Sequence, residues 1–289
     1  MKPAADAVLL FVTVIWGITF VVVKGALGHA DPLTFLALRF SVAAIAAVLI
    51  ARRGLLDAAL WRSATVLALC VGAGYQMQTW GLVWTSPSRS AFLTGLCVVL
   101  VPFLSVVLFK RRLVVPAVVG AAIAVFGLYL LTGAGSAAGT LTGDLLTVGC
   151  AVAFAFHIAL TERYAARHPA FALVAAQLVL CAGMFCLVAP FGERRIEAGP
   201  GLWIAVAVTG VVATTVGIGL QTWAQARTTA VRAALIYALE PVFAVGYSTL
   251  STGETLSSRE LLGGGLIIAG VVVGEVGAAI WRPRTAATL

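Results

Sequence analysis

The sequence predicts an all-α polytopic membrane protein with ten transmembrane helices, arranged as two inverted-topology repeats of five helices each. Three observations lead to this prediction. The 289 residues are 61% hydrophobic and only 10% charged, too few charges for the surface of a water-soluble protein. Apolar stretches of about 20 residues recur along the chain, the length that crosses the roughly 30 Å of hydrocarbon in a bilayer. A segment of the first half also returns in the second half, which defines the architecture as a repeat.

The repeated segment reads GYQMQTWGLVWTSPSRSA at 74–91 and returns 143 residues later at 217–234. Seven of its 18 positions are identical, more than an Ala-, Val- and Leu-rich composition gives by chance. The identical pairs are Gly74/Gly217, Gln78/Gln221, Thr79/Thr222, Trp80/Trp223, Thr85/Thr228, Arg89/Arg232 and Ala91/Ala234.

Ten spans can be drawn, five in each copy. The first copy takes residues 1–135 and the second takes 143–289, ending in a short cytoplasmic tail, with a linker at 136–142. The expected spans are 6–26, 33–52, 63–84, 88–109, 113–133, 143–163, 171–190, 202–225, 230–251 and 260–281.

The distribution of Lys and Arg predicts the orientation. Thirteen of them fall on one side of the predicted spans and five on the other, and the side richer in Lys and Arg faces the cytoplasm. Both termini are therefore expected inside. Because five is an odd number, the second copy enters the bilayer upside down. Inverted repeats are typical of secondary transporters, whose substrate lies between the repeats near the midplane.

Several functional classes are disfavoured by what the chain contains. Its five cysteines lie inside apolar runs, with spacings that match neither a disulfide framework nor a zinc site. The net charge of +8 comes from residues at span ends, so no nucleic-acid partner is expected. The glycine-rich segment 133–139 lacks the lysine and spacing of a phosphate loop. We expect no cofactor and no metal.

Four short motifs resemble the EamA domains of the drug/metabolite transporter superfamily. They are Trp16-Gly-Ile-Thr-Phe20, the segment from Thr85 to Thr94, Leu239-Glu-Pro-Val-Phe243, and Gly253-Glu-Thr-Leu256 before a glycine-rich last span. The resemblance covers essentially the whole chain as two domains. One departure is that Lys110-Arg111-Arg112 stands in the first copy where the second has Gly253-Glu254.

The resemblance implies a ten-span carrier of the bacterial inner membrane, most similar to the YddG-type amino-acid exporters. It also implies that spans 3, 4, 8 and 9 flank a central cavity, that spans 1, 2, 6 and 7 gate it, and that spans 5 and 10 are peripheral. The family carries many substrates, so the resemblance identifies a carrier and not its cargo.

Glu240 is the strongest candidate for a functional side chain, because an ionisable group inside a span is costly unless it serves a purpose. It lies about ten residues into its span, and Pro241 removes a backbone donor beside it. We expect a carboxylate that binds an amine or couples transport to protons. The alternative is a structural acid bonded to the opened helical turn. Pro102 is the nearest counterpart in the first copy and a candidate gating kink.

The remaining predicted substrate-binding residues are polar amides and aromatic rings. Gln78 and Gln221 can each donate and accept hydrogen bonds, and the alternative for both is interhelical bonding. The rings are expected to form apolar walls for a hydrophobic or aromatic side chain, with ordinary packing as the alternative. These aromatic candidates are Trp16, Tyr75, Trp80, Trp223 and Tyr237.

Other intramembrane polar residues have a structural interpretation. Arg39 is expected in an ion pair and His157 as a satisfied core histidine, while Lys24 and Glu162 reach toward the interface at corresponding places in the two copies. The glycines of the last span (Gly263 to Gly265, Gly270 and Gly274) are expected to pack against another helix or a second subunit. We therefore expect a monomer or weak dimer.

The charge pattern also narrows the solute. Between Trp61 and Phe109 the only basic residues are Arg62 and Arg89, both at span ends, and a phosphate needs buried basic partners. The sequence therefore predicts a secondary carrier that exports small metabolites, above all amino acids including hydrophobic and aromatic ones, driven by a solute or proton gradient. Neutral or cationic metabolites or drugs are the alternative. An intramembrane enzyme would need a nucleophile or metal constellation, and a channel a ring of polar groups.

Overall fold

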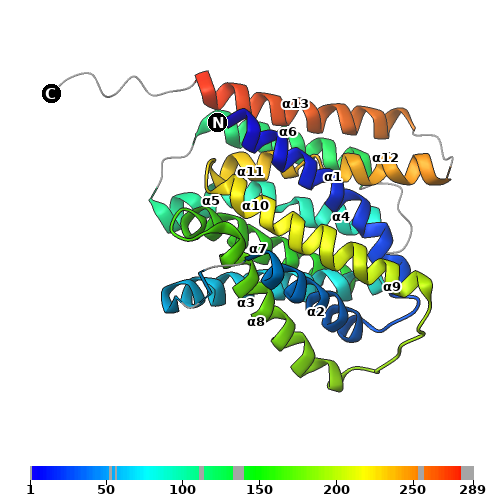
Figure 1. Ribbon diagram of the computed structural model, residues 1–289. Helices are drawn as coiled ribbons and strands as arrows, with labels where there is room; N and C mark the ends of the chain where they lie inside the picture. Colours follow the sequence, from blue (N-terminus) through cyan, green and yellow to red (C-terminus); the bar gives the residue numbers. More distant parts are fainter. Residues whose placement is uncertain are drawn as a thin grey trace.

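The computed structural model describes residues 2–51, 54–55, 57–110, 114–132, 140–252 and 257–280, and nearly all of them are helical (Figure 1). The elements are α1 (Lys2–Ala26), α2 (Pro32–Ala51), α3 (Ala58–Trp84), α4 (Pro87–Gly95), α5 (Cys97–Phe109), α6 (Val115–Thr132), α7 (Leu141–Ala165), α8 (Ala170–Val188), the 3-10 turn η1 (Ala189–Phe191), α9 (Pro200–Ala207), the π-helix η2 (Val208–Val216), α10 (Gly217–Gln225), α11 (Ala230–Tyr237), α12 (Glu240–Thr252) and α13 (Ser258–Ile280).

Eight segments of the described chain are long and apolar enough to cross a membrane, and a shorter apolar helix spans Val115–Leu131. The eight are Pro3–Ala26, Pro32–Ala51, Ala58–Trp84, Arg89–Phe109, Leu141–Ala165, Ala170–Phe191, Pro200–Gln225 and Ala230–Tyr247. The chain is therefore a multi-pass membrane protein, and the number of ten spans stays a prediction. Five of the regions used above lie wholly or mostly outside the described residues: the glycine-rich segment 133–139, the linker at 136–142, Arg111 and Arg112, the motif at 253–256 and the tail after residue 280.

Three predicted spans are not single α-helices. The span at 88–109 divides into α4 and α5, the span at 230–251 into α11 and α12, and the span at 202–225 contains the π-helix η2 between α9 and α10. A hydropathy pattern cannot detect these interruptions, because the residues on both sides are equally apolar.

The short helices α4 and α11 begin in the same way. The side chain of Ser86 accepts a hydrogen bond from the backbone N–H of Arg89 at 3.2 Å, and Thr229 accepts one from Arg232 at 3.3 Å. A hydroxyl at this position satisfies one of the unpaired N–H groups of the first turn. Since Ser86 and Thr229 lie 143 residues apart, the repeat seen in the sequence is also a repeat of local structure.

The helix α1 links the starts of α11 and α4. Near its beginning, Asp6 forms a bidentate ion pair with Arg232 of α11, with N···O distances of 2.9 and 2.7 Å. Near its end, the Lys24 ammonium donates to the carbonyl of Thr85, just before α4, at 3.1 Å. The two contacts lie 18 residues apart, about 27 Å at 1.5 Å per residue, so they mark opposite ends of the bundle.

The helix α7 makes the same two connections in the reverse order. Near its beginning, Asp144 pairs with Arg89 of α4 at 2.7 and 2.6 Å. Near its end, Glu162 accepts a hydrogen bond from the backbone N–H of Ala230, the first residue of α11, at 2.8 Å. The first helices of the two halves therefore run in opposite directions. We refer below to the Arg89 end and the Arg232 end of the bundle.

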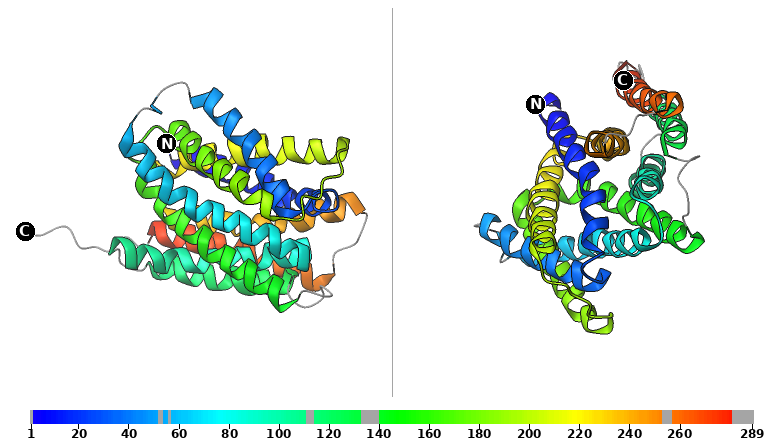
Figure 2. Two further views of the ribbon diagram at one scale, coloured as in Figure 1. Left: turned by 90° about the horizontal axis from the view of Figure 1, so that it is seen from below. Right: turned by 90° about the vertical axis from the view of Figure 1, so that its right-hand side faces the viewer.

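The helices α6 and α13 pack against each other at the periphery, and the end-on view in Figure 2 shows them side by side away from the other helices. Small residues allow this close approach. A Cβ atom added to Gly127 would lie 2.6 Å from the carbonyl oxygen of Gly263, and one added to Gly270 would lie 2.6 Å from the backbone nitrogen of Ala124. Gly263, Gly270 and Gly274 are thus packed inside the chain, as the packing interpretation predicts, whereas a Cβ atom at Gly264 or Gly265 would have no atom within 4 Å.

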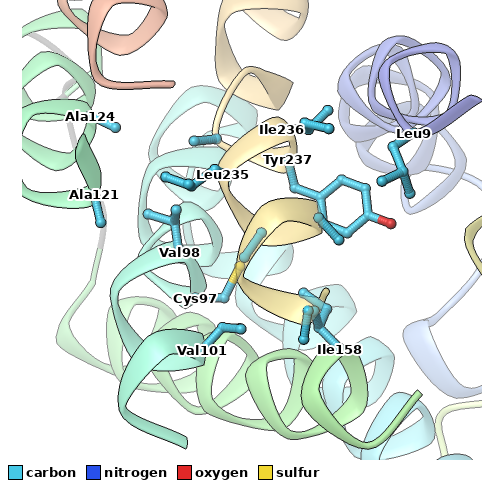
Figure 3. Packing of buried hydrophobic residues seen from close by; sticks show 14 of the residues in the cluster. Leu9, Cys97, Val98, Val101, Ala121, Ala124, Ile158, Leu235, Ile236 and Tyr237 are labelled. Atoms are coloured by element: carbon cyan, nitrogen blue, oxygen red, sulfur yellow. The ribbon is translucent and has the colours of Figure 1, made fainter. Parts of the chain in front are cut away.

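The largest buried apolar cluster joins residues of both halves, including Leu9 of α1, Cys97 and Val101 of α5, Ile158 of α7 and Tyr237 of α11 (Figure 3). Large apolar side chains also cover the outside, for example Leu49 at 73% exposure and Leu250 at 88%. An exterior of this kind fits a lipid environment.

Candidate functional site

A cavity lies between the two halves, where α1, α2, α3 and α7 meet the interruptions between α4 and α5 and between α11 and α12. Its volume, counted as the space open to the centre of a water molecule, is about 60 Å³, room for several waters. It is lined by Trp16, Thr19, Phe20, Val23, Arg39, Val71, Tyr75, Gln78, Leu82, Thr94, Cys97, Phe154, His157, Ile158, Ile218, Gln221, Tyr237 and Glu240.

Most of the lining residues come in pairs, one from each half. Residues of the third and fourth spans correspond at the shift of 143, and residues of α1 and α7 correspond at a shift of 138. The lining pairs at these shifts are Tyr75/Ile218, Gln78/Gln221, Thr94/Tyr237, Cys97/Glu240, Trp16/Phe154, Thr19/His157 and Phe20/Ile158.

The two helix interruptions bring four of these residues to the cavity. The helix α4 ends at Gly95 and α5 begins at Cys97, while α11 ends at Tyr237 and α12 begins at Glu240. The interruptions lie at the same register of the repeat. In the second half Pro241 supports the break because it has no backbone N–H. In the first half, α5 continues through Pro102, and the interruption lies earlier, at Leu96. The kink was therefore expected at the wrong residue.

The paired glutamines combine both interpretations made from the sequence. Gln78 lines the cavity and lies 3.4 Å from the Thr94 hydroxyl. Gln221 lines it as well and donates to Gln225 at 2.9 Å, which in turn donates to the Ile158 carbonyl of α7 at 2.9 Å. Gln221 is thus one member of a hydrogen-bonded chain between helices that also presents polar atoms to the cavity.

Aromatic rings form two walls of the cavity. The Trp16 indole donates to the carbonyl of Ala213, within the π-helix η2, at 2.9 Å, and its ring lies 5.3 Å from that of Tyr237. The Tyr75 and Phe154 rings meet edge to face at 5.3 Å, a favoured geometry for aromatic pairs. A site walled in this way fits an apolar or aromatic group.

The structure places Trp80 and Trp223 outside the set of lining residues. Successive positions of an α-helix are 100° apart, so a residue two positions beyond a cavity-facing glutamine points to the other side. Trp223 instead lies 4.1 Å from the Arg227 guanidinium and packs against the buried apolar cluster. Trp16, Tyr75, Gln78, Gln221, Tyr237 and Glu240 are brought together at the cavity; Trp80 and Trp223 are not.

Glu240 lies in the cavity wall with its side chain partly accessible. No ion pair joins it to a basic side chain in the described part of the chain. The helix α1 presses closely on its backbone, since a Cβ atom at Gly17 would lie 2.7 Å from the Glu240 carbonyl oxygen. The contact with α1 therefore fixes the backbone of Glu240 at the cavity wall.

Arg39 is the residue whose role the sequence interpretation misses. It is only 2% exposed, yet it lines the cavity, and its Nε donates to the Thr214 hydroxyl at 3.0 Å. The expected ion pair is not found among the described residues; the guanidinium lies instead over the Tyr75 ring, 4.4 Å from its centroid. The sequence argument against buried basic residues counted Lys and Arg only between Trp61 and Phe109. It left out span 2, which carries Arg39, and is therefore wrong for this cavity.

The π-helix η2 positions the hydroxyl group to which Arg39 donates a hydrogen bond. Its wider turns place the Thr214 hydroxyl against the carbonyl of Thr209, five residues earlier, at 2.8 Å, so Thr214 donates there and accepts from Arg39. Short π-helical segments are frequent at functional sites. The neighbouring Thr215 donates to the carbonyl of Ala43 in α2 at 2.9 Å, which fixes α2 against η2.

Thr94, Cys97, Phe154 and His157 also line the cavity but were not predicted as site residues. The repeat register contained the signal for two of them, since Thr94 and Cys97 are the counterparts of Tyr237 and Glu240. His157 lies buried with its Nε2 3.2 Å from the Gln177 side-chain oxygen, which agrees with the expectation of a core histidine with a hydrogen-bond partner.

The chain matches the model of the EamA-like transporter family twice, over residues 4–133 and 141–274. A protein of Archaeoglobus fulgidus described as an uncharacterized transporter is 31% identical over 272 residues, covering 93% of this chain and 85% of that protein. A solved structure titled only as a crystal structure of a protein superposes with a TM-score of 0.82 over 98% of this chain and all of the other, at 19% identity, so this likeness concerns the fold alone. Family and relative both indicate a transporter rather than an enzyme, and the chain belongs to the EamA-like transporter family.

Proposed function

We propose that the protein is a secondary transporter that exports amino acids, including hydrophobic and aromatic ones, by alternating access to the cavity between its halves. The cavity itself is the observation that carries this proposal. It combines aromatic walls, a pair of amides and the carboxyl group of Glu240, which suit an apolar side chain and a charged amine in one solute. The chemistry of the lining selects amino acids over sugars and over purely apolar drugs.

The proposed membrane topology has ten spans, with α6 and α13 as the fifth and the tenth. The helix α6 has 18 residues and α13 has 23, lengths of about 27 and 34 Å. The opposite directions of α1 and α7 support two inverted repeats. The excess of Lys and Arg on one side supports cytoplasmic termini in a bacterial inner membrane, and the use of the α13 glycines against α6 supports a monomer.

The ion pairs at the two ends support alternating access. Arg89–Asp144 closes one end between α4 and α7, and Arg232–Asp6 closes the other between α11 and α1. Each pair joins a helix of one half to a helix of the other, so rocking of the halves would separate them. We propose that one pair opens while the other stays closed, which exposes the cavity to one side at a time.

We assign proton coupling to Glu240. The other titratable side chains that line the cavity with it are Arg39, Tyr75, Cys97, His157 and Tyr237. Among the described residues that line the cavity, Glu240 is the only one with a carboxyl group. A carboxylate in a membrane interior is stable only with a cation or a proton. Amine and proton would then occupy it in turn, which links export to proton entry.

Counterflow in proteoliposomes tests the transport proposal. Vesicles preloaded with unlabelled L-leucine or L-phenylalanine are diluted into a trace of the labelled amino acid, and transient accumulation above protein-free vesicles is expected. Accumulation no greater than that of the protein-free vesicles for every amino acid tested would refute the proposal. Glu240→Gln should keep this exchange and lose the stimulation by an imposed pH gradient; an unchanged pH-gradient effect would remove Glu240 from the coupling role.

A further inference from the structure

The two charged residues of the cavity break its repeat symmetry. Cys97 stands at the position equivalent to Glu240, and Gln177 of α8 stands at the position equivalent to Arg39 at the shift of 138. Most of the lining therefore pairs one half with the other, whereas one basic and one acidic side chain are each supplied by one half only. Among the described residues neither charge has an ion-pair partner.

The Arg39 side chain is fixed by its neighbours in an orientation that suits ligand binding. One of its N–H groups donates to Thr214, its flat face lies on the Tyr75 ring, and the side chain is 2% exposed. The Tyr75 side chain is a second hydrogen-bonding partner of the guanidinium, and no carboxylate among the described residues pairs with it. A guanidinium has five donors in a rigid planar fork, so its remaining donors are available to a ligand in the cavity that it lines.

The chemistry of that ligand follows from the charge. A buried cation without an anion is strongly disfavoured, and a carboxylate matches the guanidinium fork with two parallel hydrogen bonds. One arginine balances one negative charge, as in a carboxylate, whereas the described lining supplies no second arginine and no lysine for a phosphate dianion.

We propose that Arg39 binds the carboxylate of the transported solute, so that the cavity selects zwitterions and rejects the corresponding amines. The inference rests on the proposed transport function and makes it narrower. Arg39 holds the carboxylate, Glu240 faces the ammonium group, and the aromatic walls hold the side chain. Cationic metabolites and drugs, left open by the sequence, are excluded as preferred solutes.

The test is a binding measurement on the purified protein in lipid nanodiscs, by isothermal titration calorimetry, with six probes. L-leucine and L-phenylalanine are compared with 3-methylbutylamine and 2-phenylethylamine, which lack the carboxylate, and with 4-methylpentanoate and 3-phenylpropionate, which lack the amine. Wild-type protein is expected to bind an amino acid at least 30-fold more tightly than its amine.

Arg39→Gln, which introduces the residue found at the equivalent position of the other half, should weaken amino-acid binding at least 30-fold and leave amine binding within threefold. Arg39→Lys should weaken amino-acid binding about tenfold, because it keeps the charge and loses the fork. Arg227→Gln is the matched control outside the cavity and should change nothing. A general folding defect would weaken every probe equally and would not change the ratio of amino acid to amine.

Two results would overturn the assignment of Arg39: amino-acid binding by Arg39→Gln within threefold of wild type, or no binding of any carboxylate probe to the wild type. The first, with counterflow intact, would leave the transport proposal standing. Conversely, Arg39-dependent binding of 4-methylpentanoate or 3-phenylpropionate without binding of any amino acid would keep the carboxylate site and refute amino-acid export.

Discussion

The two halves of this transporter build one cavity with different chemistry. Both halves break the fourth span at the same register, both place a glutamine in the lining, and each contributes one arginine and one aspartate to the two ion pairs between the halves. They differ where charge enters the cavity, since the second half supplies Glu240 and the first supplies Arg39. The shared features can produce the alternation between two sides, and the unshared ones can recognise the solute.

The two halves share their helix packing but differ in the charged residues that line the cavity, and the two properties would serve different purposes. Equal packing of the two halves allows two states of similar free energy, a condition for a cavity that alternates between the two sides. An equal lining would give a solute no preferred orientation. Under the proposed function, matched positions belong to the frame that moves and the unmatched charged positions to the binding site, and substitutions can test each class.

The largest expected effect is at the unmatched pair Glu240 and Cys97. Glu240→Ala should lower the initial rate of amino-acid counterflow more than 50-fold, because it removes every oxygen proposed to accept a hydrogen bond from the ammonium group, whereas Glu240→Gln keeps one. Cys97→Ala, at the equivalent position, should lower it less than twofold. Equal losses for the two variants would show that the position matters for packing rather than for charge.

A smaller effect is expected from the matched ion pairs. Reversing one charge, as in Arg89→Glu, should lower the counterflow rate about tenfold, because like charges then face each other across the Arg89 end. The double variant Arg89→Glu with Asp144→Arg should recover most of the rate. Arg232→Glu alone, and together with Asp6→Arg, should give the same pattern. If neither double variant recovers the counterflow rate, the ion pairs have no gating role.

The aromatic residues should give a graded result. Trp16→Phe removes the indole hydrogen bond to Ala213 and part of the cavity wall, so counterflow should fall about fivefold. In the variants Trp80→Phe and Trp223→Phe, which lie outside the lining, the counterflow rate should fall less than twofold. A loss at Trp223 as large as that at Trp16 would mean that the cavity extends beyond the residues that line it here.

The smallest effect on transport is expected at the α6–α13 contact, where stability should change instead. Gly270→Leu would drive a side chain into α6 and should destabilise the protein by about 1–3 kcal/mol, seen as a lower midpoint of thermal unfolding. Gly264→Leu, whose Cβ position has no atom within 4 Å, should leave the midpoint unchanged. Transport per folded molecule should be the same for both variants.

The membrane class and the repeat could be predicted from the sequence, because hydropathy and a fixed shift of 143 residues can be read directly from the order of residues. Six of the eight predicted substrate-binding residues line the cavity, and their role in binding stays a prediction. The interruptions at Leu96 and in η2 could not, since helix breaks within apolar segments leave no mark in hydropathy. Arg39 was missed as a lining residue because its partners, Thr214 and Tyr75, come from other helices. Trp80 and Trp223 were included although their spacing from the glutamines places them on another face.

The proposed alternating exposure of the cavity can be tested most directly at Cys97, a thiol in its lining. In a variant with the other four cysteines replaced by alanine, a membrane-impermeant maleimide would be applied separately to each side of the membrane. Asp144→Asn should raise labelling of Cys97 from the Arg89 end and lower it from the Arg232 end, and Asp6→Asn should do the reverse. Labelling that rises from both sides together, or a change on the same side in both variants, would contradict a carrier whose two ends open in turn.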